Sequence, residues 1–110
     1  MATPRIRVEP KIIKNSHCLG LAAALNKALP SAKGQFIARM DGDDVCLPNR
    51  FSQQVVFLNE HPEIGVLGGG AIEIDTVGHI IGEIYSREKH EDLIAHIYEE
   101  NPFIHPSVMV

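Results

Sequence analysis

Three carboxylates stand within four residues at Asp41, Asp43 and Asp44, directly after an apolar run that ends at Met40. Close carboxylates repel one another, and the end of a buried strand is partly desolvated, so this cluster is costly unless a positive group lies beside it. Mg²⁺ and Mn²⁺ prefer hard oxygen ligands, often one or two carboxylates together with the phosphates of a substrate. The acids are therefore candidate ligands of a divalent cation, and the alternative is an ordinary solvated Asp-Gly turn.

The residues around the acids predict a strand, a turn and a helix in succession. Residues 35–40 are nearly all apolar, as in a strand that is covered on both faces of a parallel sheet. Pro48 suits the first turn of a helix, and apolar residues then recur at helical spacing. This predicted buried stripe consists of Leu47, Phe51, Val55 and Leu58. The polar residues expected to face away from it are Asn49, Arg50, Gln53 and Gln54.

The remaining segments complete an α/β pattern. We expect a short strand at Ile6 and Val8, a helix over residues 21–29, and a strand at residues 64–67 that runs into three glycines. A hairpin is predicted from residues 72–74 and 79–85, then a helix over residues 87–100 with Ser86 as its N-cap, then an extended segment from Phe103 onward. The predicted fold is a single α/β domain over residues 1–110, with a mostly parallel sheet, an antiparallel hairpin and flanking helices. In such sheets ligands bind beyond the carboxyl ends of the strands, where the acids fall.

Spacing excludes several other kinds of site. An EF-hand that starts at Asp41 would need glycine where Cys46 stands and glutamate where Ser52 stands. His90 and His96 are six residues apart on a predicted helix and face different sides, so they do not suit zinc. The three glycines at residues 68–70 lack the lysine and spacing of a phosphate loop, and predict a bend or a close backbone approach. The acids among residues 88–92 are expected on a solvated helix face.

His105 is a polar residue between Ile104 and Pro106, in a segment that is otherwise apolar. A polar side chain in such surroundings needs a hydrogen-bond partner. The two interpretations are a structural hydrogen bond and a role on the acceptor side of a reaction.

Composition and charge limit the partners and the location. A net charge of -4 provides no basic footprint for nucleic acid. Cys18 and Cys46 lack the spacing of a paired motif, so we expect free thiols in a reducing cytoplasm. No signal-peptide pattern is present, and the longest apolar stretch, residues 64–74, is too short and too rich in glycine to span a bilayer. The expected location is the cytoplasm, including its boundary at the inner membrane face.

Four stretches of the chain together resemble family 2 glycosyltransferases of the GT-A fold. These stretches are residues 19–26, 38–44, 47–51 with Gln54, and 101–109. Their order and spacing are similar to those of bacterial members that build surface polysaccharides. The acidic stretch followed by Pro48 and Arg50 is the most specific part. The resemblance implies a partial GT-A, Rossmann-like fold over most of the chain from about Asn15 onward.

The resemblance also implies a reaction. Family members transfer a sugar from a nucleotide-diphosphate-sugar donor to the hydroxyl of a glycan or lipid-linked acceptor, usually with inversion, and use Mg²⁺ or Mn²⁺. Carried over by position, Asp43 would coordinate the metal, Asp41 would lie near the ribose or the metal, and Asp44 would support one of these two acids. Asn26 would lie beside the nucleotide, and Arg50 would brace the loop rather than touch the substrate.

The chain also departs from the family pattern. Cys18 stands where many members have asparagine, and Leu25 where many have arginine, which leaves the contacts to base and ribose open. The family's opening strand and turn are expected before Arg5, and the segment with the general base after Val110. On this interpretation the chain is the central part of a catalytic domain and is not expected to turn over by itself.

Two other classes of function stay open. A magnesium-dependent nucleotidyltransferase also places acids after a strand, and it predicts the use of nucleoside triphosphates. A truncated, non-catalytic interaction module would use the acids only to solvate a turn. Exposed strand edges favour pairing with another chain, so self-association is expected.

Overall fold

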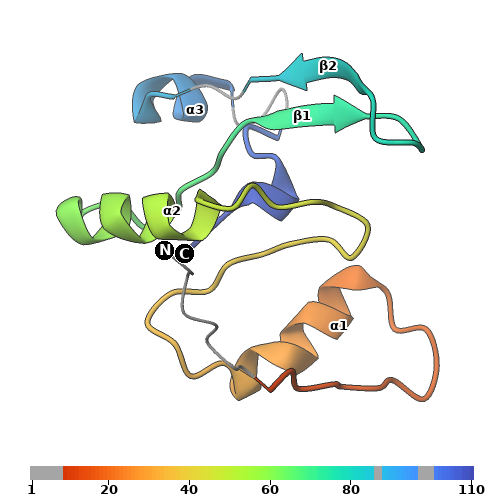
Figure 1. Cartoon of the computed structure of the whole chain (residues 1–110). Coiled ribbons are helices and arrows are strands. Elements are labelled where there is room, and N and C mark those ends of the chain that lie inside the picture. Colours follow the sequence, from red (N-terminus) through yellow and green to blue (C-terminus); the bar gives the residue numbers. More distant parts are fainter. Residues whose placement is uncertain (1–8, 86–87, 97–100) are drawn as a thin grey trace, which may run out of the picture. The chain divides into compact units, whose positions relative to one another are not determined.

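The computed structural model describes residues 9–85, 88–96 and 101–110 (Figure 1). The chain divides into two compact units, Met1–Lys33 and Gly34–Val110. Helix α1, Leu21–Ala28, lies in the first unit, and a 3-10 helix η1, Leu29–Ser31, continues it. Gly20 precedes α1 with a φ of 82°, and Lys27 Nζ donates hydrogen bonds to Lys14 O at 3.3 Å and Asn15 Oδ1 at 3.1 Å. The predicted helix is confirmed. The predicted strand at residues 6 and 8 lies outside the described residues.

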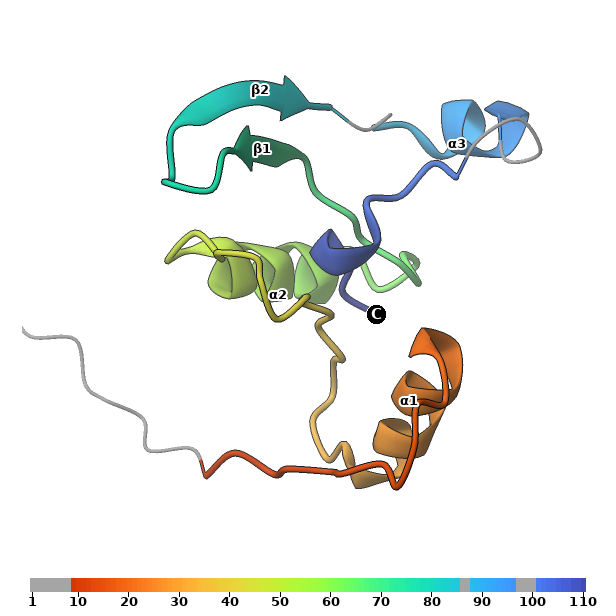
Figure 2. The ribbon, with the colours of Figure 1, turned by 90° about the vertical axis from the view of Figure 1, so that its right-hand side faces the viewer.

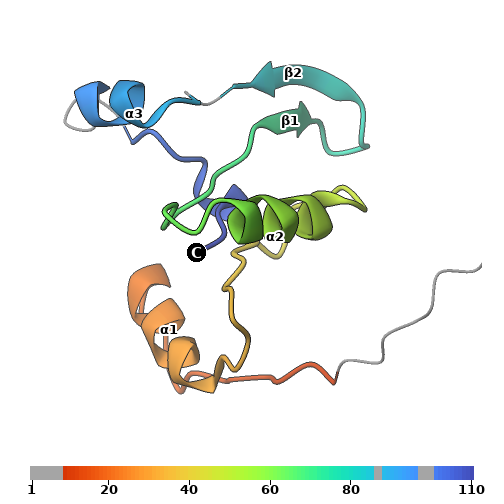
Figure 3. The same ribbon diagram turned by 90° about the vertical axis from the view of Figure 1, so that its left-hand side faces the viewer.

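Within the described residues, the second unit contains two helices, a hairpin and a second 3-10 helix. These elements are α2, Arg50–Glu60; β1, Ala71–Ile74; β2, Ile80–Ile84; α3, His90–His96; and η2, His105–Ser107. In Figures 2 and 3, which view the chain from opposite sides, the blue coil of η2 lies beside α2. The α/β class is confirmed. Of the predicted helix at residues 87–100, the structure shows α3 from His90 to His96; residues 88–89 are described and precede the helix, while Ser86, Arg87 and residues 97–100 lie outside the described residues.

The predicted hairpin is confirmed, and Asp75 stabilises its loop. The strands pair antiparallel, with Ala71 opposite Ile84. Asp75 Oδ1 accepts hydrogen bonds from the amides of Val77, at 3.0 Å, and His79, at 2.9 Å. Together with Gly78, which has a φ of 90°, this Asx turn lets the chain reverse within a few residues.

The central backbone pairings of the second unit are antiparallel. Residues 108–110 lie between two segments, because Met109 forms antiparallel bridges to both Ala38 and Leu67. Residues 37–39 and 66–68 therefore run in the same direction, but residues 108–110 separate them. The sequence led us to expect a mostly parallel sheet. Instead, both segments form their backbone hydrogen bonds with residues 108–110, which lie between them.

Helix α2 packs on this pairing with a partly polar face. Leu58 and Met109 are the buried apolar side chains of the described residues, at 5% and 2% exposure, and Gln54 is buried at 8%. The prediction that Gln54 and Arg50 face away is wrong, since Arg50 is half-buried. Phe51, predicted in the buried stripe, is 43% exposed. The reason is that α2 faces backbone carbonyls at residues 39, 107 and 108, which require hydrogen-bond donors.

The start of α2 also differs from the prediction. Pro48 lies in a turn that the Arg50 amide closes by donating to Leu47 O at 3.1 Å. Asn49 is the N-cap residue, so the helix begins at Arg50. His61 ends it, as predicted. No helix of the described residues is long and apolar enough to cross a membrane.

The three glycines at residues 68–70 allow a close approach of other segments, as predicted. A Cβ on Gly68 would lie 2.9 Å from Phe103 Cδ1, and one on Gly70 would lie 3.1 Å from Ile84 O. A Cβ on Gly68 would force the Phe103 ring to move, and one on Gly70 would press on the backbone of β2. Glycine therefore suits the segment where the chain passes from the central pairing into the hairpin.

Candidate functional site

The three acids lie on one tight turn immediately after the central pairing. The amide of Asp44 donates to Asp41 O at 3.2 Å, and Gly42 and Asp43 occupy the middle of the turn. The turn forms without a positive φ at Gly42. It brings carboxylate oxygens of Asp41, Asp43 and Asp44 within 4.8 Å of one another. The turn thus gathers side chains that an extended chain would direct to opposite sides.

The arrangement fits a small divalent cation. Mg²⁺ binds oxygen at about 2.1 Å, so two of its ligands are at most about 4.2 Å apart. Asp43 and Asp44 are exposed and Asp41 is half-buried, so rotation of the two exposed side chains can close the remaining gap. The donor set of hard carboxylate oxygens suits Mg²⁺ or Mn²⁺ better than a soft metal.

Arg50 and Gln54, one helical turn apart on α2, hold the backbone beside this turn. Arg50 Nη2 donates to Arg39 O at 2.9 Å and lies 3.4 Å from Val108 O. Arg50 Nε donates to Gln54 Oε1 at 3.1 Å, and Gln54 Nε2 donates to Ser107 O at 2.8 Å. The sequence prediction missed the inward position of this pair. Their spacing of four residues, at which polar side chains meet on a helix, was the available signal.

Ser107 joins the same region to the glycine segment. Its Oγ accepts a hydrogen bond from the Gly69 amide at 3.0 Å and donates one to Ile104 O at 2.6 Å. Ser107 is 9% exposed. Residues 105–107 form η2 instead of the predicted extended chain, because the amides of Ser107 and Val108 turn back to Ile104 O and His105 O.

His105 lies at the start of η2 and is exposed. Its Nε2 contacts the side-chain amide of Asn101, which provides the polar partner that the sequence required. His105 is not in the group of potential metal ligands found among the described residues. Asn26 lies on α1 in the first unit, with an exposed side chain. Cys18 and Cys46 are free thiols, as expected.

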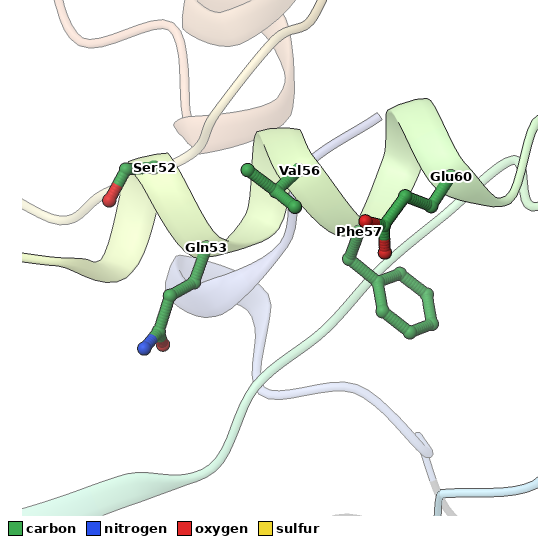
Figure 4. Close-up of a pocket in the computed structure, with 5 residues that line it drawn as sticks. All are labelled: Ser52, Gln53, Val56, Phe57 and Glu60. Atoms are coloured by element: carbon green, nitrogen blue, oxygen red, sulfur yellow. The ribbon is translucent and has the colours of Figure 1, made fainter.

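A pocket of about 330 Å³ lies on the outer face of α2 (Figure 4). It is lined by Ser52, Gln53, Val56, Phe57 and Glu60, all of them from that helix. None of the predicted site residues lines it. We therefore place the candidate site at the acidic turn rather than at this pocket.

The region that contains the turn, α2 and η2 lies inside a match to a known family. The model of glycosyl transferase family 2 matches residues 7–110. The putative glycosyltransferase EpsE of Bacillus subtilis is 36% identical over 91% of this chain and 35% of its own length. An uncharacterized glycosyltransferase of Methanocaldococcus jannaschii is 34% identical over 89% of this chain and 34% of its own length.

A UDP-Glc:alpha-D-GlcNAc-diphosphoundecaprenol beta-1,3-glucosyltransferase of Escherichia coli is 46% identical over 42% of this chain and 18% of its own length. No solved structure matches the chain. The matches group the chain with glycosyltransferases. It belongs to glycosyl transferase family 2. The chain spans about a third of the length of the two relatives that it matches over most of its own length.

Proposed function

We propose that the full-length gene product transfers a sugar from a nucleotide-diphosphate-sugar donor to an acceptor hydroxyl, with inversion, and that this chain carries part of its donor site. The single observation that carries the proposal is the gathering of three carboxylates on one turn, inside the region that matches glycosyl transferase family 2. In this proposal Asp43 and Asp41 hold a Mg²⁺ or Mn²⁺ ion, and Asp44 supports one of them.

Electrostatics supports the need for a cation. A diphosphate that approaches three close carboxylates on a chain of net charge -4 is repelled by all of them. When bound, the cation neutralises this repulsion and stabilises negative charge on the departing diphosphate. The acids themselves hold and orient the ion. Asn26 is proposed to lie beside the nucleotide, and His105 on the acceptor side.

The proposed donor and acceptor classes follow from the family and from one relative. The name of the Escherichia coli relative gives UDP-Glc as its donor and a diphosphoundecaprenol-linked GlcNAc as its acceptor. We extend only the classes to this chain: a nucleotide-diphosphate sugar, and a glycan or lipid-linked acceptor in cell-surface polysaccharide synthesis. A lipid-linked acceptor would place the reaction in the cytoplasm at the inner membrane face.

The test measures sugar transfer by the full-length gene product with UDP-glucose and other nucleotide sugars, with Mn²⁺ and after removal of metal by EDTA. Asp43→Ala should lower the rate at least about a hundredfold, since a metal ligand is lost. Glu63→Ala removes an equal charge from an exposed position outside the turn and serves as the matched control.

Two outcomes would decide against the proposal. Full activity of Asp43→Ala would remove the metal role from the acidic turn. Turnover of nucleoside triphosphates in place of nucleotide sugars would instead identify a nucleotidyltransferase. If neither class of donor reacts and Mn²⁺ does not bind, the interaction module becomes the better interpretation.

A further inference from the structure

The central pairing ends at Arg39, two residues before the acidic turn, and it ends asymmetrically. The Arg39 amide donates to Val108 O at 3.0 Å. In a regular antiparallel pair the Val108 amide would donate back to Arg39 O. It donates instead to His105 O, at 3.4 Å, as part of η2. Arg39 O therefore lacks its backbone donor at the point where the chain leaves for Asp41.

Arg50 supplies the missing donor. Its Nη2 lies 2.9 Å from Arg39 O and 3.4 Å from Val108 O, so one guanidinium spans both sides of the interrupted pairing. Gln54 holds this guanidinium through its Oε1 and holds the end of η2 through Ser107 O. No buried side-chain nitrogen or oxygen of the described residues lacks a hydrogen bond, so the bridge is complete.

We propose that Arg50 and Gln54 are positioning residues, which together set the direction in which the chain enters the acidic turn. Two backbone oxygens that the pair holds, Arg39 O and Ser107 O, lie next to a proposed site: Arg39 precedes Asp41 by two residues, and Ser107 follows His105 by two. The bridge thus ties the proposed donor side to the proposed acceptor side. What the acids bind rests on the proposed function, but the positioning itself does not.

A purely structural role is the competing interpretation. If the pair serves only to dock α2, its loss lowers the stability of the unit and leaves the geometry of the turn in the folded molecules unchanged. If the pair positions the turn, its loss also changes the turn in molecules that remain folded. The two interpretations therefore differ in the properties of the folded protein.

Neighbouring glutamines provide a matched pair of variants. Gln54→Met keeps the length of a buried side chain and removes both hydrogen bonds, whereas Gln53→Met makes the same change at an exposed position of the same helix. Arg50→Lys keeps the charge but cannot reach both Arg39 O and Gln54 Oε1 with a planar fork. This milder variant keeps the test decisive if Gln54→Met fails to fold.

The first measurement uses the 110-residue chain without metal. Backbone amide chemical shifts and hydrogen exchange of residues 41–44 should change in Gln54→Met and Arg50→Lys, and should stay as in the wild type in Gln53→Met. The second uses sugar transfer by the full-length gene product. The Mn²⁺ concentration for half-maximal rate should rise about tenfold in Gln54→Met, as for losses of groups that orient metal ligands, and should not rise in Gln53→Met.

Unchanged amide shifts and exchange at residues 41–44 in folded Gln54→Met and Arg50→Lys would overturn the inference, even if both variants are less stable. An unchanged Mn²⁺ requirement together with a lower melting temperature would do the same. If the wild type transfers no sugar and binds no Mn²⁺, the proposed function fails, and the amide measurement alone decides whether the pair positions the turn.

Discussion

Replacing Ser107 with alanine removes a single oxygen atom but should clearly destabilise the second unit. Ser107 is 9% exposed. Its hydroxyl group accepts a hydrogen bond from the Gly69 amide at 3.0 Å and donates one to Ile104 O at 2.6 Å. A net hydrogen bond contributes about 1 kcal/mol, and an unpaired buried amide costs about 1 to 3 kcal/mol. Ser107→Ala keeps Cβ but removes the acceptor of the half-buried Gly69 amide and the donor to Ile104 O, so the variant should lose about 1 to 3 kcal/mol of unfolding free energy.

Urea denaturation of the chain, followed by circular dichroism in the far ultraviolet, measures this loss. Ser52→Ala is the matched control, because the Ser52 hydroxyl is exposed and bonds only to Asn49 O, at 3.0 Å, in the first turn of α2. That variant should stay within about 0.5 kcal/mol of the wild type. Equal midpoints for the two variants, with equal slopes, would refute the argument that Ser107 ties η2 to the glycine segment.

Gly68→Ala should lower the unfolding free energy, measured by thermal unfolding, by about 1 to 3 kcal/mol, because the new Cβ would lie 2.9 Å from Phe103 Cδ1. In Gly42→Ala the new Cβ would have no other atom within 4 Å, so this control should be as stable as the wild type. The amide of His79 holds the pKa of Asp75 below its ordinary value of 3.8, so this carboxylate stabilises the hairpin loop above that pH, and the stability is lost as the pH falls through the folded-state pKa. The protection factor of the His79 amide, which is its exchange relative to the intrinsic rate at the same pH, should therefore fall only in that acidic range, and a fall already near neutral pH would contradict the assignment. Light scattering should show self-association of the isolated chain, since large apolar side chains of β1 and β2 are exposed; a monodisperse monomer would count against it.

The sequence determined the local elements and the candidate site of this protein. Helix α1, the hairpin and the region of α2 were predictable because periodicity and turn residues act over a few neighbouring positions. The acidic turn was predictable for the same reason, since Gly42 and the three acids are adjacent in the chain. The family resemblance also came from the sequence, and the match over residues 7–110 confirms it.

Only the tertiary structure decided which face of α2 is buried and which segments pair. Gln54 meets Ser107 across 53 positions and Arg50 meets Val108 across 58, so no local pattern reveals that polar side chains face inward there. The antiparallel position of Met109 between Ala38 and Leu67 is likewise a long-range choice. These contacts put donors where interrupted backbone pairing needs them, because an unpaired buried carbonyl is costly. Sequence thus specified the acids, and the fold decided what holds the backbone beside them.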